Sequence, residues 1–431
     1  MEKEKRKKKP LRKKILRIIA WFFGILFLLI FLIIIFIRSP WGQNIIVQRA
    51  VQYVSDKTHT AVAIEKLFIT FDGNIMLKGL YLEDTKGDTL VYSKSLEAGI
   101  PLLPIIRGNA IGIDYLKWEG LKANIFRKDS IEGYNFQFLI DAFATDKPKP
   151  VEKDTSSTMP NIIIGDVFFS DFDLNFQDDV LGIDTDLKLG NLTLQMKKTD
   201  LEKMDFRASK IALSNTRAHF KQTPVPPTPK EESDMPLPFL QVDELALKNV
   251  FVDFISEPNR IAANLELADF LIELKKGDLE ANEFEVGNLR LKNSVVILHT
   301  QTETNGVTET AENLKDEAKK DIQKFDWPEM RIAVSKIDFR ENHIGYYVSD
   351  AQVKKGIFDA NALDLQDFNL VVNDVHLKDK KAGMVIDRFS FEEGSGLILK
   401  KLETAISATD EDIVVANLDF ALNENSLKGD A

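Results

Sequence analysis

Few residues in this 431-residue sequence are of types that perform chemistry, and those few do not cluster. Cysteine is absent, which excludes disulfides, thiolate metal sites and cysteine nucleophiles. The sequence also lacks the glycine-rich phosphate-binding loops, the nucleophile motif Gly-x-Ser-x-Gly and the zinc motif His-Glu-x-x-His. We therefore expect no catalytic residue, no bound metal and no cofactor, and we expect that the protein is not an enzyme.

Histidines and acidic pairs are the remaining candidates for ligand or acid–base roles. Each histidine lies in or beside a segment with strand-like alternation, which favours a structural role. The five are His59, His219, His299, His343 and His376. The acidic pairs Asp171/Asp173 and Asp178/Asp179 offer the oxygen ligands that Ca²⁺ binds. Their spacing favours the polar face of a strand followed by a turn.

The charge is distributed very unevenly along the chain. Residues 1–17 contain ten Lys or Arg and two Glu, a local charge of +8, whereas the whole chain carries −11. The remainder therefore carries −19. A polyanionic body repels the phosphate backbone, because affinity for nucleic acid comes mainly from clustered Lys and Arg. Nucleic acid is not an expected partner.

Residues 18–37 are twenty consecutive uncharged, mostly apolar residues. As a helix they extend about 30 Å, which is the thickness of the hydrocarbon core of a bilayer. A cleaved signal peptide is the alternative, but its apolar region is usually only about 7 to 15 residues long. We predict a membrane helix over 18–37, with the basic tail 1–17 in the cytoplasm and the body across the membrane. Its anchor residues include Ile18, Trp21, Phe22, Leu28 and Ile37.

Residues 38–57 predict a second, amphipathic helix. Ser39 and Pro40 suit the N-cap and the first helical position. Apolar residues then recur at roughly helical spacing from Trp41 to Val54. Such a helix either lies at the membrane surface or packs on the start of the next domain, and the sequence favours neither arrangement.

Residues 60–431 are dominated by a period of two, which is typical of strands with one apolar and one polar face. A 13-residue pattern, Φ-x-x-Φ-x-Φ-x-x-x-x-Φ-x-Φ with Φ a bulky apolar residue, recurs among these strands. It starts at residues 113, 164, 242, 286, 334 and 365, and its first half also starts at 64. We interpret each unit as a strand, a tight turn such as Lys248-Asn249 or Lys292-Asn293, and a returning strand.

The predicted fold is mainly β: an elongated, curled antiparallel sheet of repeated hairpins that forms a groove, preceded by one N-terminal transmembrane helix. About 18 to 24 strands, at about 4.8 Å each, would give a sheet on the order of 100 Å long. Three segments interrupt the repeats: proline-rich loops at 145–160 and 222–238, and a charged helical or disordered insertion at 303–329. A short helix within 134–143 is expected to plug one end of the sheet.

The order of these features resembles the start of the AsmA-like superfamily: a basic tail, one membrane span, a Ser-Pro-Trp-Gly helix start at 39–42 and a strand at 62–71. The segment GYNFQFLIDAF at 133–143 makes the sequence similar to Bacteroidota-type TamB proteins, the inner-membrane component of a translocation and assembly module. The resemblance covers essentially the whole chain. Full-length relatives carry a further C-terminal domain, so we expect a fragment, the N-terminal portion, or a shortened member.

The resemblance implies a bridge-like lipid carrier. Its sheet would curl into an apolar groove, anchored in the bacterial inner membrane with the body in the periplasm. The resemblance further implies phospholipid transport between the inner and outer membranes and support of outer-membrane biogenesis and protein assembly. An outer-membrane assembly barrel protein is the protein partner that it implies.

The apolar positions of the repeats are the candidate groove lining, where they would contact the acyl chains of phospholipids. They are Phe172, Leu174, Phe176, Leu245, Leu247, Val252, Phe254, Leu289, Leu291, Phe368 and Leu370. Moving a chain of about 15 methylenes through water costs about 12 kcal/mol, at about 0.8 kcal/mol per methylene. A continuous apolar trough removes this barrier without any residue performing chemistry.

Two other functions fit the same sequence. In a membrane-anchored scaffold protein, the apolar faces would pack against each other in a dry β-sandwich, without lipid transfer. An extracytoplasmic hydrolase with an unrecognised site is the third alternative. Lipid class, direction of transfer and oligomeric state leave no signature in the sequence.

Overall fold

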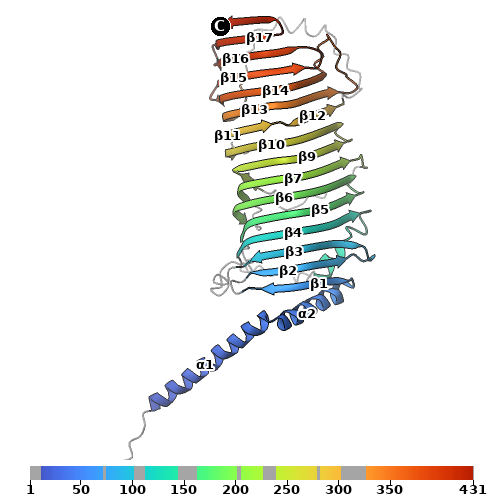
Figure 1. Ribbon diagram of the computed structural model, residues 1–431, viewed down its shortest axis with the longest axis vertical. Coiled ribbons are helices and arrows are strands. Elements are labelled where there is room, and N and C mark those ends of the chain that lie inside the picture. The colour runs from blue at the N-terminus through green and yellow to red at the C-terminus, as the bar shows by residue number, and fades with distance from the viewer. Residues whose placement is uncertain are drawn as a thin grey trace, which may run out of the picture.

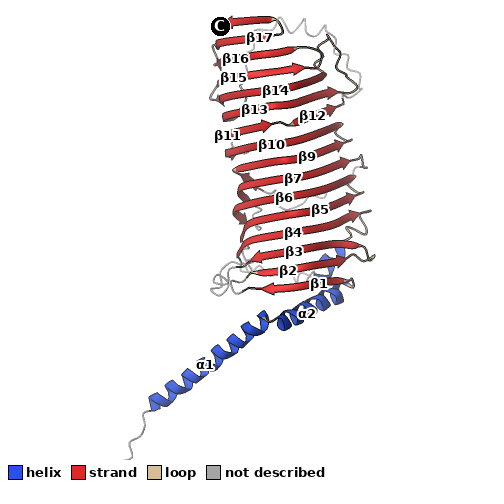
Figure 2. Ribbon diagram, viewed as in Figure 1, coloured by secondary structure: helices blue, strands red, loops and turns tan. Residues whose placement is uncertain are grey.

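The computed structural model describes residues 11–70, 74–100, 112–143, 163–200, 205–226, 239–278, 282–301 and 327–430. Over these ranges the protein is mainly β, with one long curled sheet and a few helices near its N-terminal end (Figures 1 and 2). The predicted fold class is confirmed. The predicted segments 145–160 and 303–326, most of 222–238 and the tail 1–10 lie outside the described residues.

The helix α1 (Leu11–Arg38) contains the predicted membrane span. Its segment Trp21–Arg38 is long and apolar enough to cross a bilayer. Ser39 alone separates it from α2 (Pro40–Thr58), and the Ser39 hydroxyl caps α2 by accepting a hydrogen bond from the backbone N–H of Gly42 at 2.9 Å. Only one residue therefore separates α2 from the end of α1, the helix that contains the predicted membrane span.

The short helix α4 (Gln137–Phe143) follows the fourth strand. It lies beside α2, where the rings of Phe143 and Tyr53 have centroids 6.2 Å apart. α2 itself packs on the first strand, so both helices lie at the same end of the sheet (Figure 1).

Eighteen strands are described, and most are far longer than the usual five or six residues. They are β1 (Val62–Ile69), β2 (Ile75–Glu83), β3 (Thr89–Gly99), β4 (Gly112–Arg127), β5 (Ile163–Asp178), β6 (Ile183–Asp200), β7 (Asp205–Gln222), β8 (Phe239–Val242), β9 (Glu244–Ser256), β10 (Ile261–Asp278), β11 (Glu283–Lys292), β12 (Val295–Thr300), β13 (Arg331–Val348), β14 (Ala362–Lys378), β15 (Lys381–Glu393), β16 (Ile398–Ala408), β17 (Ile413–Leu422) and β18 (Asn425–Gly429).

The strands lie in the sheet in the order in which they occur along the chain (Figure 1). β8 and β9 both pair with β7, and β11 and β12 both pair with β10 and with β13. β8 and β9 therefore follow one another along a single line in the sheet, and so do β11 and β12.

Most neighbouring strands are antiparallel, but at three places the sheet is parallel: β4 with β5, β7 with β8 and β9, and β13 with β11 and β12. The connections there are residues 128–162, 223–238 and 301–330, which contain the three predicted interruptions. A parallel neighbour requires a crossover of a dozen or more residues, whereas a hairpin does not. The interruptions are therefore the crossovers of a mixed sheet.

The tight turns predicted within the 13-residue units are wrong. β9 continues straight through Lys248-Asn249, with Asn249 in the left-handed region at φ 53°. Asn293, at φ 50°, separates β11 from β12, which continue in the same direction beside β13. Asp171 has the equivalent conformation in β5, at φ 53°. Glycine, asparagine and aspartate adopt this conformation most readily, so these residues bend the strand without reversing it.

Each left-handed residue also inverts the alternation of side chains. The rings of Phe169 and Phe172 flank Asp171 and have centroids 6.0 Å apart. In a regular strand, residues three apart point to opposite faces. The bend therefore brings the apolar side chains of both halves of a unit to one face. This explains why the apolar positions that flank the middle of the pattern are five residues apart, an odd spacing.

The sheet has a single layer over the described residues. Its strands make their substantial contacts with hydrogen-bonded neighbours, and the dry β-sandwich of the scaffold alternative is not the arrangement found there. Few apolar side chains are fully buried, and those of the apolar face are mostly half-buried. The hydrophobic core is thus one face of an open, curled sheet.

Candidate functional site along the apolar face

Residues that pair directly on neighbouring strands point to the same face of a sheet. Following the pairs from strand to strand gives an unbroken line of bulky apolar residues across thirteen strands, which we call the first row. The first row is Leu67, Leu77, Leu96, Trp118, Phe169, Leu192, Leu213, Leu247, Phe270, Leu291, Phe339, Leu370 and Phe389. At about 4.8 Å per strand it is about 58 Å long.

A second row runs beside the first, two residues away along each strand except β15, where a register shift makes the spacing three. It is Ile69, Ile75, Ala98, Leu116, Val167, Leu194, Ile211, Leu245, Ile272, Leu289, Ile337, Val372 and Ile386. All thirteen residues are again apolar. Two adjacent rows without a polar member make an apolar strip along the sheet.

Two further rows lie beyond the left-handed residues. The third row is Val62, Leu82, Val91, Ala123, Leu174, Leu187, Ala218, Val252, Leu265, Val296, Ile344 and Leu365. The fourth row is Ile125, Phe176, Thr185, Phe220, Phe254, Ala263, Leu298, Tyr346 and Leu363. The four rows together are the apolar face, in which Thr185 and Tyr346 carry the only hydroxyl groups.

The structure brings the predicted groove residues together on this face. Leu247, Leu291 and Leu370 belong to the first row, Leu245 and Leu289 to the second, Leu174 and Val252 to the third, and Phe176 and Phe254 to the fourth. The other two lie against the first row: Phe172 contacts Phe169, and Phe368 contacts Phe389 with ring centroids 5.7 Å apart. Their contact with lipid remains a prediction.

Several aromatic members of the first row were missed by the sequence analysis. Trp118 and Phe339 occupy the sixth position of units that the pattern did identify. That apolar position could have identified both residues as members of the apolar face. Phe270 and Phe389 lie on β10 and β15, which do not match the pattern. Only the register shows that they continue the row.

The first row is accessible along its length. Its members are half-buried, apart from Leu291, which is buried at 8% exposure. On β5, Phe172, Leu174 and Phe176 are half-buried, whereas the residues between them are exposed. Each apolar side chain is therefore covered in part by its neighbours on the same sheet. No second layer covers the apolar face among the described residues.

The opposite face is polar and charged. Ion pairs join neighbouring strands there, such as Lys210 with Glu244 at 2.7 Å and Arg290 with Asp269 at 2.8 Å. Exposed pairs of this kind contribute little stability, about 0 to 1 kcal/mol each. Their role is to keep this face solvated, which leaves the other face for apolar contacts.

The membrane-anchor residues project outward from α1. Trp21, Phe22 and Leu28 are 69%, 63% and 54% exposed, and Ile37 is half-buried near the junction with α2. The side chain of Ile18 lies outside the described part of the structure. Exposure of large apolar side chains along a helix of this length is expected where lipid, not protein, surrounds it.

Asp178 forms the most buried charge cluster of the described residues. Its carboxylate is fully buried and accepts hydrogen bonds from Arg127 Nε at 3.0 Å and Nη2 at 2.5 Å, and from the Tyr134 hydroxyl at 2.7 Å. Burial alone raises the pKa of Asp178, but these hydrogen bonds outweigh it and the pKa lies below its usual value. The pair joins the ends of the parallel strands β4 and β5.

The other candidates for chemistry have structural partners. Asp171 is the left-handed residue of β5, and the Asp179 carboxylate accepts a hydrogen bond from Gln177 at 2.9 Å. His219 Nδ1 lies 2.8 Å from a carboxylate oxygen of Asp253 on the neighbouring strand. Within the described ranges, no group of three or more His, Asp or Glu side chains is placed to hold a metal ion.

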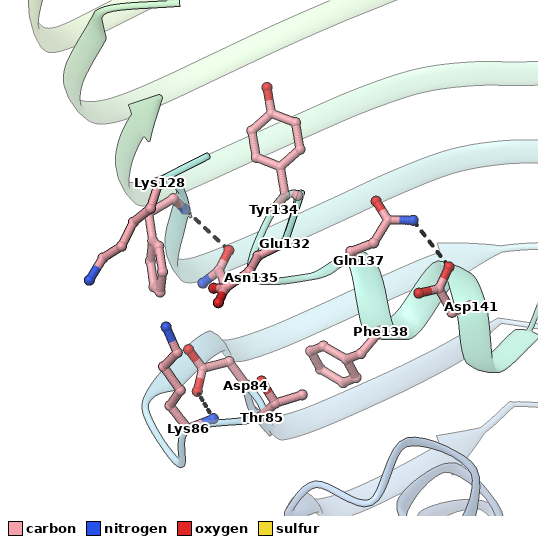
Figure 3. A pocket seen from close by; sticks show the side chains of 12 residues that line it. Asp84, Thr85, Lys86, Lys128, Glu132, Tyr134, Asn135, Gln137, Phe138 and Asp141 are labelled. Carbon is pink, nitrogen blue, oxygen red and sulfur yellow. Dashed lines mark hydrogen bonds between the residues drawn. The ribbon is translucent and has the colours of Figure 1, made fainter. Parts of the chain in front are cut away.

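A cavity of about 390 Å³ lies at the α2 end of the sheet (Figure 3). Its walls are the turn between β2 and β3, the end of β4 with the loop that follows, and α4. Charged side chains and aromatic rings line it together. Comparison with known proteins gives no further assignment, because no family model matches the sequence and no curated protein matches it significantly.

Proposed function

We propose that this protein is a TamB-like member of the AsmA-like superfamily, a membrane-anchored carrier that transports phospholipid between the inner and outer bacterial membranes. The curled sheet would be the groove, and the apolar face would hold the acyl chains. The observation that carries the proposal is the first row, which is apolar on thirteen successive strands and is half-exposed nearly throughout.

The free-energy cost of moving a lipid chain through water supports this proposal. An acyl chain of about 15 methylenes loses about 12 kcal/mol of favourable apolar contact when it enters water. The second row lies beside the first for the same thirteen strands, so a chain sliding along them stays in apolar contact at each step. No residue needs to form or break a bond, and a lipid gradient or a partner protein supplies direction.

The proposed location follows from the ends of α1. The basic residues before its apolar segment would stay in the cytoplasm under the positive-inside rule, which puts the sheet in the periplasm. In this position the carrier would also support outer-membrane biogenesis and protein assembly, with an outer-membrane assembly barrel protein as its partner.

Photocrosslinking in cells tests the carrier function. A photoreactive residue is placed at Phe172, Leu247 or Leu370 of the full-length protein, and each position should give phospholipid adducts detectable by mass spectrometry. Asp173 and Lys248 are matched controls, because each is exposed on the opposite face beside a test residue. Adducts with protein alone at all three test positions would refute the carrier and support a scaffold.

A further inference from the structure

The cavity at the α2 end of the sheet has two walls whose backbone is fixed by hydrogen bonds. In the turn between β2 and β3, the buried carboxylate of Asp84 accepts the backbone N–H groups of Lys86 at 2.8 Å and Asp88 at 3.0 Å. Gly87 completes the turn at φ 87°, a conformation that suits glycine. The turn therefore holds Lys86 at the edge of the cavity.

The facing wall is the loop after β4, which Asn135 ties back onto the strand. Its side chain accepts the backbone N–H of Phe126 at 3.1 Å and donates to the Asn124 carbonyl at 2.9 Å. Tyr134, next to it, donates its hydroxyl to the buried Asp178. This loop carries Lys128 and Glu132, so both charges are presented by a fixed segment.

Both lysines of the cavity lie at one end, where the Asp84 carboxylate is buried and accepts backbone N–H groups of the turn (Figure 3). Lys86 and Lys128 lie at one end, and Asp141 lies at the other end, on α4, with Glu132 between them. The Lys86 ammonium is 5.5 Å from the centre of the Phe126 ring. Among the described residues, neither lysine forms an ion pair with protein, so both ammonium groups are available to a ligand.

The cavity also adjoins the apolar face. The Tyr134 ring lies 6.1 Å from the ring of Phe176, a member of the fourth row. Phe138 contributes a further aromatic ring to the lining. A ligand with a charged head in the cavity could therefore continue as an apolar chain onto the sheet.

We propose that this cavity binds the phosphoethanolamine headgroup of a zwitterionic phospholipid. Lys86 and Lys128 bind the phosphate, and Glu132 and Asp141 bind the ammonium group. The proposal rests on the carrier function and specifies its substrate class. It also places the headgroup site near the anchor, since α4 contacts α2 through Phe143 and α2 follows α1 directly.

Headgroup selectivity tests this site separately from lipid carriage. Full-length protein in detergent is equilibrated with equal amounts of phosphatidylethanolamine, phosphatidylcholine and phosphatidylglycerol, and the bound lipids are quantified by mass spectrometry. The wild type should be enriched in phosphatidylethanolamine. Substituting Lys86→Gln with Lys128→Gln should reduce that enrichment about tenfold or more. Without its charge-assisted hydrogen bonds to phosphate, the headgroup leaves the cavity in which Glu132 and Asp141 select the ammonium, while the apolar face still holds the same total amount of lipid.

Two further variants distinguish a binding site from a structural effect. Asp141→Asn with Glu132→Gln should abolish the preference for phosphatidylethanolamine over phosphatidylglycerol, because the groups that bind the ammonium are neutralised. Lys122→Gln, an exposed residue on β4 that does not line the cavity, should change nothing. Equal binding of all three lipids by the wild type, or an unchanged preference in both double variants, would overturn the headgroup site.

Soluble probes separate a lipid headgroup from free phosphate as the natural ligand. Glycerophosphoethanolamine should bind the wild-type protein and perturb the NMR signals of methyl-labelled or lysine-labelled protein at the cavity, whereas inorganic phosphate should bind more weakly. Tighter binding of inorganic phosphate would overturn the headgroup assignment. Absence of any bound lipid in the first experiment would instead refute the carrier function itself.

Discussion

At the residue scale, the cluster around Asp178 shows how the parallel crossover after β4 is secured. The carboxylate also accepts the backbone N–H groups of Val180 and Leu181, each at 3.0 Å. All its partners lie on β4, on the loop after it or on the turn after β5. A buried carboxylate with this many donors is stable only while it is ionised and paired.

Replacing this carboxylate should destabilise the fold. Asp178→Asn leaves Arg127 without its charged partner, and breaking a buried ion pair typically costs about 3 to 5 kcal/mol. Chemical denaturation of the full-length protein measures the loss. Asp173→Asn, on the exposed face of the same strand, should change the free energy of unfolding by less than about 0.5 kcal/mol. Equal effects of the two substitutions would contradict this role for Asp178.

The same carboxylate should make stability depend on pH in the acid range. The pKa of Asp178 is lower in the folded protein than its value of about 3.9 in an unfolded chain. Its contribution is therefore fully present above about pH 4 and is lost as the pH falls through the lower folded value. Unfolding curves between pH 5 and pH 2 should show a smaller decrease for Asp178→Asn than for the wild type.

At the scale of elements, the left-handed residues set the shape of the long strands. Gly120, Asp171, Asn249, Asn293 and Glu341 all occupy the eighth position of the 13-residue unit and all have φ between 50° and 66°. They lie on β4, β5, β9, between β11 and β12, and on β13, with other strands between some of them. The register places them at one level, so the bends line up across the sheet. This alignment keeps all four apolar rows on one face while the strand curves.

Substitutions at Asn249 test whether the left-handed bend is required. Asn249→Val should destabilise the protein by about 1 to 2 kcal/mol, since a β-branched residue tolerates a left-handed conformation poorly. Asn249→Gly should be nearly neutral. Lys248→Val is the matched control, because that exposed neighbour lies in the same strand and has no left-handed backbone. Denaturation midpoints compare the three, and a neutral Asn249→Val would show that the bend is not required.

At the scale of the whole molecule, one uninterrupted apolar strip joins the α2 end of the sheet to β15. The sheet has sixteen strand positions, because β8 with β9 and β11 with β12 each share one, and it extends about 72 Å at about 4.8 Å per step. This is shorter than the length predicted from the sequence, since units interpreted as two strands are single bent strands.

A charge placed in the middle of the strip should stop movement along it. Leu247→Arg puts a guanidinium in the first row on β9, and passing lipid chains would have to desolvate it. Lipid supplied at the inner membrane should then label a photoreactive residue at Phe172 and no longer label one at Leu370. Phe251→Arg, on the same strand but 38% exposed on the other face, should leave both adducts intact. Unchanged labelling at Leu370 in Leu247→Arg would contradict transport along the rows.

The sequence by itself determined the apolar helix and the β-rich body, because a charge-free run and a period of two are properties of neighbouring residues in one chain. It also identified members of all four rows, such as Leu245, Leu247, Val252 and Phe254. Only the tertiary structure decided that Asn249 bends a strand and that three connections are crossovers. It alone brought Lys86 opposite Lys128 and Glu132. Register and left-handed backbone depend on hydrogen bonds to strands distant in sequence, which local periodicity does not encode.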